Sequence, residues 1–175
     1  MPETQAGVRL ALAPEGSATV STGLPVLDHL IGELAASGRF RLTLEVAPNG
    51  PDLAASVAGR ALGASLAELL GDATAAGAGW AVVPSAEALA LASLERDDDA
   101  RLVSNVEFSD QSVGGLATDV ASGFLRETAE AAHVNLHVRL LEGTDPQHVL
   151  TAIYKAVGAA LGQACRPAAT EEESS

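Results

Sequence analysis

The sequence predicts an α+β protein built from two similar halves. In each half an amphipathic helix runs directly into a strand, and a glycine-containing turn then leads into a second helix. Apolar and polar residues alternate over 40–46 and again over 134–140, about 95 residues apart, which suits a duplicated half-domain. The helices after these strands also share similar tails, ALGASL from Ala61 and AVGAAL from Ala156. We expect each half to form a small mixed four-stranded sheet with two helices packed on one face.

The first half is predicted to span 1–77. It opens with alternation over 8–13, a turn at 14–17 and a return strand to Thr22, which together predict a hairpin. Pro25 suits the first turn of the next helix, and Gly38 is expected to end that helix in a left-handed conformation. The predicted buried positions of this helix are Leu27, Leu30, Ile31 and Leu34, and those of the helix after Asn49 are Leu53, Val57, Leu62, Leu66 and Leu69.

The second half is predicted to span 78–165. Strands are expected over 80–83, 86–94 and 101–108, although 86–94 also fits a helical turn. The last helix has a clear apolar face at Val149, Leu150, Ile153, Val157 and Leu161. The acidic segment 166–175 is expected to be disordered.

Composition narrows the classes of function. A formal net charge of −13 disfavours binding to nucleic acid or to anionic membranes. No apolar run reaches the expected length of a membrane span, and no secretory signal is evident at the N-terminus. The single cysteine, Cys165, excludes an intrachain disulfide, so the reducing cytoplasm is the expected compartment.

Four histidines are the first candidates for chemistry: His29, His133, His137 and His148. None belongs to a His-x-x-x-His or His-Glu-x-x-His motif. Taken singly, each fits an ordinary surface or turn position.

Several motifs together resemble the imidazoleglycerol-phosphate dehydratase family. TGLPVLDHL over 22–30 is similar to the family's T-G-[IL]-x-F-L-D-H-M, and 143–164 is similar to G-x-N-x-H-H-x-x-E-A-x-F-K-A-x-A-x-A-L. LHV over 136–138 matches a family strand, and PSAEAL over 84–89 resembles P-M-D-E-A-L. The resemblance covers roughly 8–164. It implies the duplicated fold and a hydro-lyase of histidine biosynthesis. It also implies two manganese ions held by histidines and glutamates, and trimers that build a closed shell with metals at subunit boundaries.

The resemblance places remnant metal ligands at His29, His137 and His148, a candidate catalytic residue at Glu87 and a phosphate-binding lysine at Lys155. Other ligand positions are altered. The family's first H-H-x-x-E-D aligns with DLAASV over 52–57, and in the second motif Gln147 replaces a histidine and Thr151 a glutamate. An acidic turn, 97–99, stands where the family has S-G-R.

We therefore expect a family member that has lost dimanganese dehydratase catalysis and holds no cofactor. Two alternatives stay open. One is an active dehydratase that binds manganese through the three histidines together with Asp52 or Asp145. The other is a structural or small-ligand-binding protein, with a small phosphorylated compound as the candidate ligand. We expect a homo-oligomer, a trimer or a larger shell, with no nucleic-acid or membrane partner, whose sedimentation manganese does not change.

Overall fold

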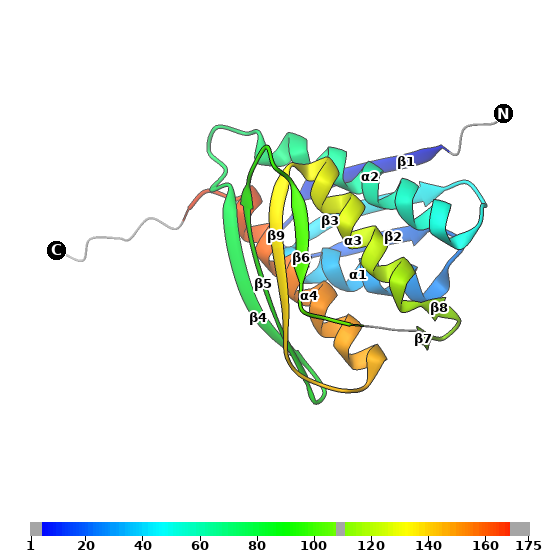
Figure 1. Ribbon diagram of the computed structural model, residues 1–175. Helices are drawn as coiled ribbons and strands as arrows, with labels where there is room; N and C mark the ends of the chain where they lie inside the picture. Colours follow the sequence, from blue (N-terminus) through cyan, green and yellow to red (C-terminus); the bar gives the residue numbers. More distant parts are fainter. Residues whose placement is uncertain (1–4, 108–110, 169–175) are drawn as a thin grey trace.

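The computed structural model describes residues 5–107 and 111–168, and it confirms the α+β class. Two sheets lie on the outside and four long helices lie between them (Figure 1). The helices are α1 (Pro25–Gly38), α2 (Pro51–Leu70), α3 (Thr118–Ala132) and α4 (Pro146–Cys165). Helices α1 and α2 cover the first sheet, and α3 and α4 cover the second. The two helix layers meet where α1 packs on α4 and α2 packs on α3, so both halves share one core.

The two sheets repeat one topology. The first has the order β1 (Ala6–Leu12), β3 (Phe40–Val46), β2 (Ser17–Ser21). The second has the order β4 (Ala78–Ser85), β5 (Ala88–Arg96), β9 (Val134–Glu142), β6 (Arg101–Ser104). In each sheet the central strand, β3 or β9, is antiparallel to one neighbour and parallel to the other. A short β7 (Ser112–Val113) and β8 (Leu116–Ala117) precede α3.

This topology corrects the predicted hairpin, because β3 lies between β1 and β2. Helix α1 serves as the crossover that returns the chain parallel to β2, as a parallel strand pair requires. The first sheet also has three strands within the described residues, whereas the second gains β4. The segment 86–94 falls largely within β5, so its helical alternative is wrong, and the acidic turn 97–99 lies between β5 and β6. The strand predicted over 101–108 ends at Ser104, so its predicted extent was too long. Residue 108 and most of the acidic tail lie outside the described residues.

Helix α1 buries the four predicted apolar residues, but Gly38 has another role. Gly38 is the last helical residue, and the left-handed conformation falls on Arg39, with φ of 53°. A Cβ at Gly38 would lie 2.6 Å from the Gly158 carbonyl oxygen on α4. Gly38 therefore permits close contact between helices. The equivalent left-handed residue after α3 is His133, with φ of 58°.

Helix α2 buries small residues where the sequence pattern predicted some of the large ones. Leu53 is 42% exposed, whereas Gly59 and Gly63 are buried against α3. A Cβ at either glycine would come within 2.7 Å of a carbonyl oxygen of α3, so only glycine permits this spacing. Among the described residues, α2 alone is long and apolar enough to cross a membrane, which the prediction from composition missed. Its packing against α3 is typical of a core helix.

Helix α4 buries all five predicted apolar positions. The fully buried Tyr154 hydroxyl donates a 2.8 Å hydrogen bond to the Ala121 carbonyl and so joins α4 to α3. Just after α4, the Arg166 guanidinium donates to the carbonyl oxygens of Ala13, Gly38, Arg39 and Gly162, at 2.8–3.2 Å. Arg166 thus ties the end of the chain's second half to the first half.

Candidate functional site

The repeated topology creates two equivalent pockets where helices begin. The first, called here the His29 pocket, lies between the starts of α1 and α4, has a volume of about 270 Å³, and includes His29, Gln147 and Thr151. The second, the Asp52 pocket, lies between the starts of α3 and α2, has a volume of about 160 Å³, and includes Asp52 and Ser56. Both contain the segments where the resemblance places the two altered metal motifs. The pockets are therefore the natural places to test the donor chemistry.

The His29 side chain lies on the exposed surface of α1. Its Nε2 atom is 3.7 Å from one oxygen of Glu33, whose other oxygen is 3.8 Å from Lys155 Nζ. Asp28, beside it in sequence, accepts hydrogen bonds from the Thr22 amide and hydroxyl, at 3.0 and 2.5 Å, and so fixes the entry into α1. Glu33 offsets part of the Lys155 charge that a phosphate would need. Glu33 was not predicted as a site residue from the sequence, although its spacing of four residues from His29 places the two side chains side by side on a helix.

His148 is held by Glu87. His148 Nδ1 lies 2.6 Å from Glu87 Oε2, and Glu87 Oε1 accepts a 3.2 Å hydrogen bond from the Asp145 amide. The Asp145 side chain caps α4 by accepting from the Gln147 and His148 amides, at 2.9 and 3.3 Å. These contacts, called here the Glu87 clasp, join the β4–β5 turn to the start of α4.

The β4–β5 turn that carries Glu87 has an unusual backbone conformation, and the contacts of Glu87 shift the pKa of its carboxyl group. Ala86, in the tight turn before Glu87, has φ of 50°. The pKa of Glu87 lies below its usual value, chiefly because its own backbone N–H donates to the carboxylate. Desolvation raises this pKa, whereas His148 and the Asp145 amide lower it further. The ionised form of Glu87 is therefore the favoured form at neutral pH.

His137 lies apart from the other two histidines. It is on the exposed face of β9, in a cleft that also contains Arg39, Trp80 and Asn135. Within 5–107 and 111–168, no group of three or more histidine, cysteine, aspartate or glutamate side chains is placed to hold a metal ion. A single chain therefore does not bring His29, His137 and His148 together.

The donor set of the two pockets does not fit a dimanganese centre. Such a centre needs imidazole nitrogens and carboxylate oxygens. Leu53 has no donor atom, and the hydroxyls of Ser56 and Thr151 donate to Glu127 Oε1 and to the Gln147 carbonyl, at 3.2 and 2.8 Å. The Asp52 pocket is lined by the carboxylates of Asp52, Asp119 and Glu127 but by no imidazole, and Glu127 lies 4.0 Å from Arg60. Neither pocket therefore supplies a full set of imidazole and carboxylate ligands.

The duplicated α+β fold with paired helix-start pockets defines the class of protein. The model of the family described as imidazoleglycerol-phosphate dehydratase matches residues 22–161. The chain is 34% identical to the imidazoleglycerol-phosphate dehydratase of Desulforudis audaxviator, over 94% of this chain and 86% of that protein. It is 35% identical to that of Desulfitobacterium hafniense, with the same coverage. This chain belongs to the imidazoleglycerol-phosphate dehydratase family.

Solved structures agree on the fold. The crystal structure of the dehydratase from Staphylococcus aureus superposes with a TM-score of 0.85 at 24% identity, covering 93% of this chain and 94% of that one. The Pyrococcus furiosus enzyme, in complex with (S)-C348, gives a TM-score of 0.84 at 22% identity, covering 99% and 96%. Family membership supports a dehydratase-related function in histidine biosynthesis.

Proposed function

We propose that this chain keeps the family fold but does not carry out manganese-dependent dehydration. The observation that carries the proposal is the matched loss in two equivalent pockets. In one, Asp52, Leu53 and Ser56 stand at ligand positions of the family motif, and in the other Gln147 and Thr151 do. Neutral amide and hydroxyl groups bind a hard-to-borderline divalent cation weakly, and a hydrocarbon side chain does not bind it at all.

An active enzyme with a rebuilt site is the second candidate. The Glu87 clasp favours it, because a carboxylate bonded to one imidazole nitrogen often orients the other nitrogen toward a metal. His29 and His137 would then have to be supplied by neighbouring copies, with Asp52 or Asp145 as substitute ligands. Asp145 already accepts two backbone hydrogen bonds at the start of α4, which disfavours it as a ligand. Glu87 would in that case be the candidate catalytic residue.

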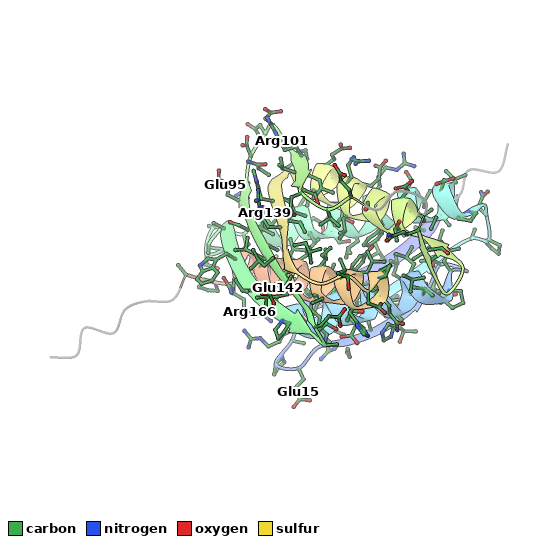
Figure 2. All side chains as sticks on the ribbon, turned by 60° about the horizontal axis from the view of Figure 1, so that its bottom comes forward. Glu15, Glu95, Arg101, Arg139, Glu142 and Arg166 are labelled. Atoms are coloured by element: carbon green, nitrogen blue, oxygen red, sulfur yellow. The ribbon has the colours of Figure 1, made fainter. Side chains whose placement is uncertain are left out.

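We also propose a homo-oligomer in the cytoplasm, a trimer or a larger shell. The outward face of the second sheet exposes Trp80, Val82, Val103 and Leu141, at 41–64%. Figure 2 shows Glu95, Arg101 and Arg139 along the same sheet, so charges of both signs border the apolar side chains. A second copy offers matching apolar area and opposite charges. A small phosphorylated ligand near Lys155 is the candidate for a binding role, and its test is a ligand-induced rise in melting temperature.

Metal analysis combined with a dehydratase assay tests the central proposal. The purified chain is expected to hold far less than one manganese per chain and to give no turnover. The matched control restores the ligand types with Asp52→His, Leu53→His, Ser56→Glu, Gln147→His and Thr151→Glu. If the restored chain binds manganese and the parent does not, the altered positions account for the loss. Stoichiometric manganese in the parent, with turnover, would establish the second candidate.

A further inference from the structure

A small pocket lies in the second half, where β6 and β9 run beside α3 (Figure 1). It is called here the Arg126 pocket, and its volume is about 220 Å³. The polar side chains of its lining are Ser104, Ser122 and Arg126. The buried part of its lining is entirely apolar and consists of Leu125, Val138, Leu150 and Ile153. The pocket therefore joins a hydrocarbon surface to one cation and two hydroxyls.

The first half has a carboxylate where this pocket has a hydroxyl. Counted back from the left-handed residues Arg39 and His133, Asp28 of α1 is equivalent to Ser122 of α3. The Asp28 carboxylate accepts hydrogen bonds from the amide and hydroxyl of Thr22 and so joins α1 to the segment after β2. Ser122 is shorter and neutral, so the second half does not supply its own carboxylate at this position.

Arg126 adds a positive charge at the exposed side of the pocket. Its equivalent on α1, counted in the same way, is Gly32. No carboxylate oxygen lies within 4.0 Å of the Arg126 guanidinium among the residues that the structure describes. Arg126 also borders the Asp52 pocket, so Asp52, Asp119 and Glu127 lie farther off on that side. A guanidinium offers paired N–H donors that match a carboxylate, and this one is available to a ligand.

We propose that the Arg126 pocket binds a small monocarboxylate with an apolar body of about six carbons. The carboxylate pairs with Arg126 and accepts a hydrogen bond from the Ser122 hydroxyl, and the hydrocarbon covers the buried apolar lining. The Ser104 oxygen already accepts from the Val106 amide, which leaves its O–H free to donate.

The size of the pocket limits the ligand. A volume of 220 Å³ is about that of seven water molecules in the liquid, and it is smaller than the roughly 300–1,000 Å³ of sites for drug-sized ligands. The bound carboxylate supplies the negative charge that Asp28 supplies at the equivalent place in the first half. This inference does not depend on whether the chain binds manganese.

Hexanoate and its neutral analogue hexanamide test the proposal in the full chain, because they share the apolar body and differ in the carboxylate. Ligand-observed NMR titration measures the affinity, and the melting temperature rises when a ligand binds only the folded state. Hexanoate is expected to bind at least about tenfold more tightly than hexanamide, as a charge-assisted pair with arginine allows. Acetate at the same concentration lacks the apolar body and is expected to give a much smaller rise.

Matched variants place the ligand in the pocket. Arg126→Gln is expected to weaken hexanoate binding about tenfold and to leave hexanamide binding unchanged. Ser122→Leu fills the pocket with a side chain that suits a helix, and is expected to abolish binding of both compounds. Arg41→Gln removes the same charge from the exposed outer face of the first sheet and is expected to leave hexanoate binding unchanged.

Three results would overturn the proposal. The first is no binding of hexanoate to the parent chain, and the second is equal affinity of the parent for hexanoate and hexanamide. Both need no variant, so they stand even if a substitution impairs folding. The third is hexanoate binding that a folded Arg126→Gln chain retains at full strength.

Discussion

The substitution Gly158→Ala probes the contact that holds the two halves together. A Cβ at Gly158 would overlap the Leu34 carbonyl oxygen and lie 2.8 Å from the Leu34 carbonyl carbon. Ordinary contact begins near 3.4 Å, so the carbonyl carbon alone requires α1 and α4 to separate by about 0.6 Å, and the closer carbonyl oxygen requires more. Separation would also open the neighbouring close backbone contact at Gly162, where a Cβ would lie 2.5 Å from the Gly38 carbonyl oxygen.

The expected cost follows from two opposing effects. Overpacking against a rigid backbone costs about 3 kcal/mol, and alanine regains about 1 kcal/mol of helix propensity over glycine. The net loss of unfolding free energy is therefore about 2 kcal/mol, which corresponds to a fall of about 4–8 °C in Tm for a chain of this size. Urea titration followed by circular dichroism measures it.

Gly32→Ala is the matched control on α1. No atom lies within 4 Å of a Cβ at Gly32, so this substitution is expected to stabilise the chain by about 0.5–1 kcal/mol. If Gly158→Ala and Gly32→Ala change stability equally, close packing at Gly158 is not what joins the halves.

Three further predictions concern single side chains. Because the pKa of Glu87 is lowered on folding, its ionised form stabilises the chain above its ordinary pKa of 4.5, and this stabilisation is lost as pH falls through the lowered value. Glu87→Gln should therefore flatten the pH dependence of Tm below about pH 4.5, and an unchanged profile would contradict the clasp. Arg166→Lys should lower the unfolding free energy by about 1–2 kcal/mol, since an ammonium cannot reproduce four forked hydrogen bonds, and an unchanged urea midpoint would argue against that role. Burial raises the pKa of Cys165 to about 12, so a thiol reagent at pH 8 should label it only after unfolding, and fast labelling of the native chain would refute its burial.

Much of the fold was predictable because apolar spacing is a local signal. The buried face of α1, the five buried positions of α4 and the duplicated order of elements all follow from periodicity. The strand order was not predictable in the same way. Pairing of β1 and β2 with the later β3 is a non-local choice, so the predicted hairpin was wrong.

Two predictions about individual helix residues, Gly38 and Leu53, were wrong. Gly38 looked like a helix terminator, but it serves the approach of α4. Leu53 looked like a core residue, but small residues fill the α2–α3 contact and leave Leu53 exposed. Close packing selects residues by size, and hydropathy does not report size.

The candidate site was only partly predictable. The family motifs predicted the segments that form the two pockets. These segments lie at the starts of equivalent helices. The Glu87 clasp and the pairing of Glu33 with Lys155 depend on contacts between different elements or helix faces. The sequence placed Arg166 in a tail predicted to be disordered. Its ordered position was not predictable, because its partners are backbone carbonyls that a sequence pattern does not reveal.

Manganese binding by the assembled protein tests the central proposal most directly. The purified chain is first stripped of metal and then dialysed against manganese. It is expected to bind almost no manganese and to sediment as it does without metal. Two tightly held manganese ions per chain, with dehydration of imidazoleglycerol phosphate, would contradict the proposed loss of catalysis.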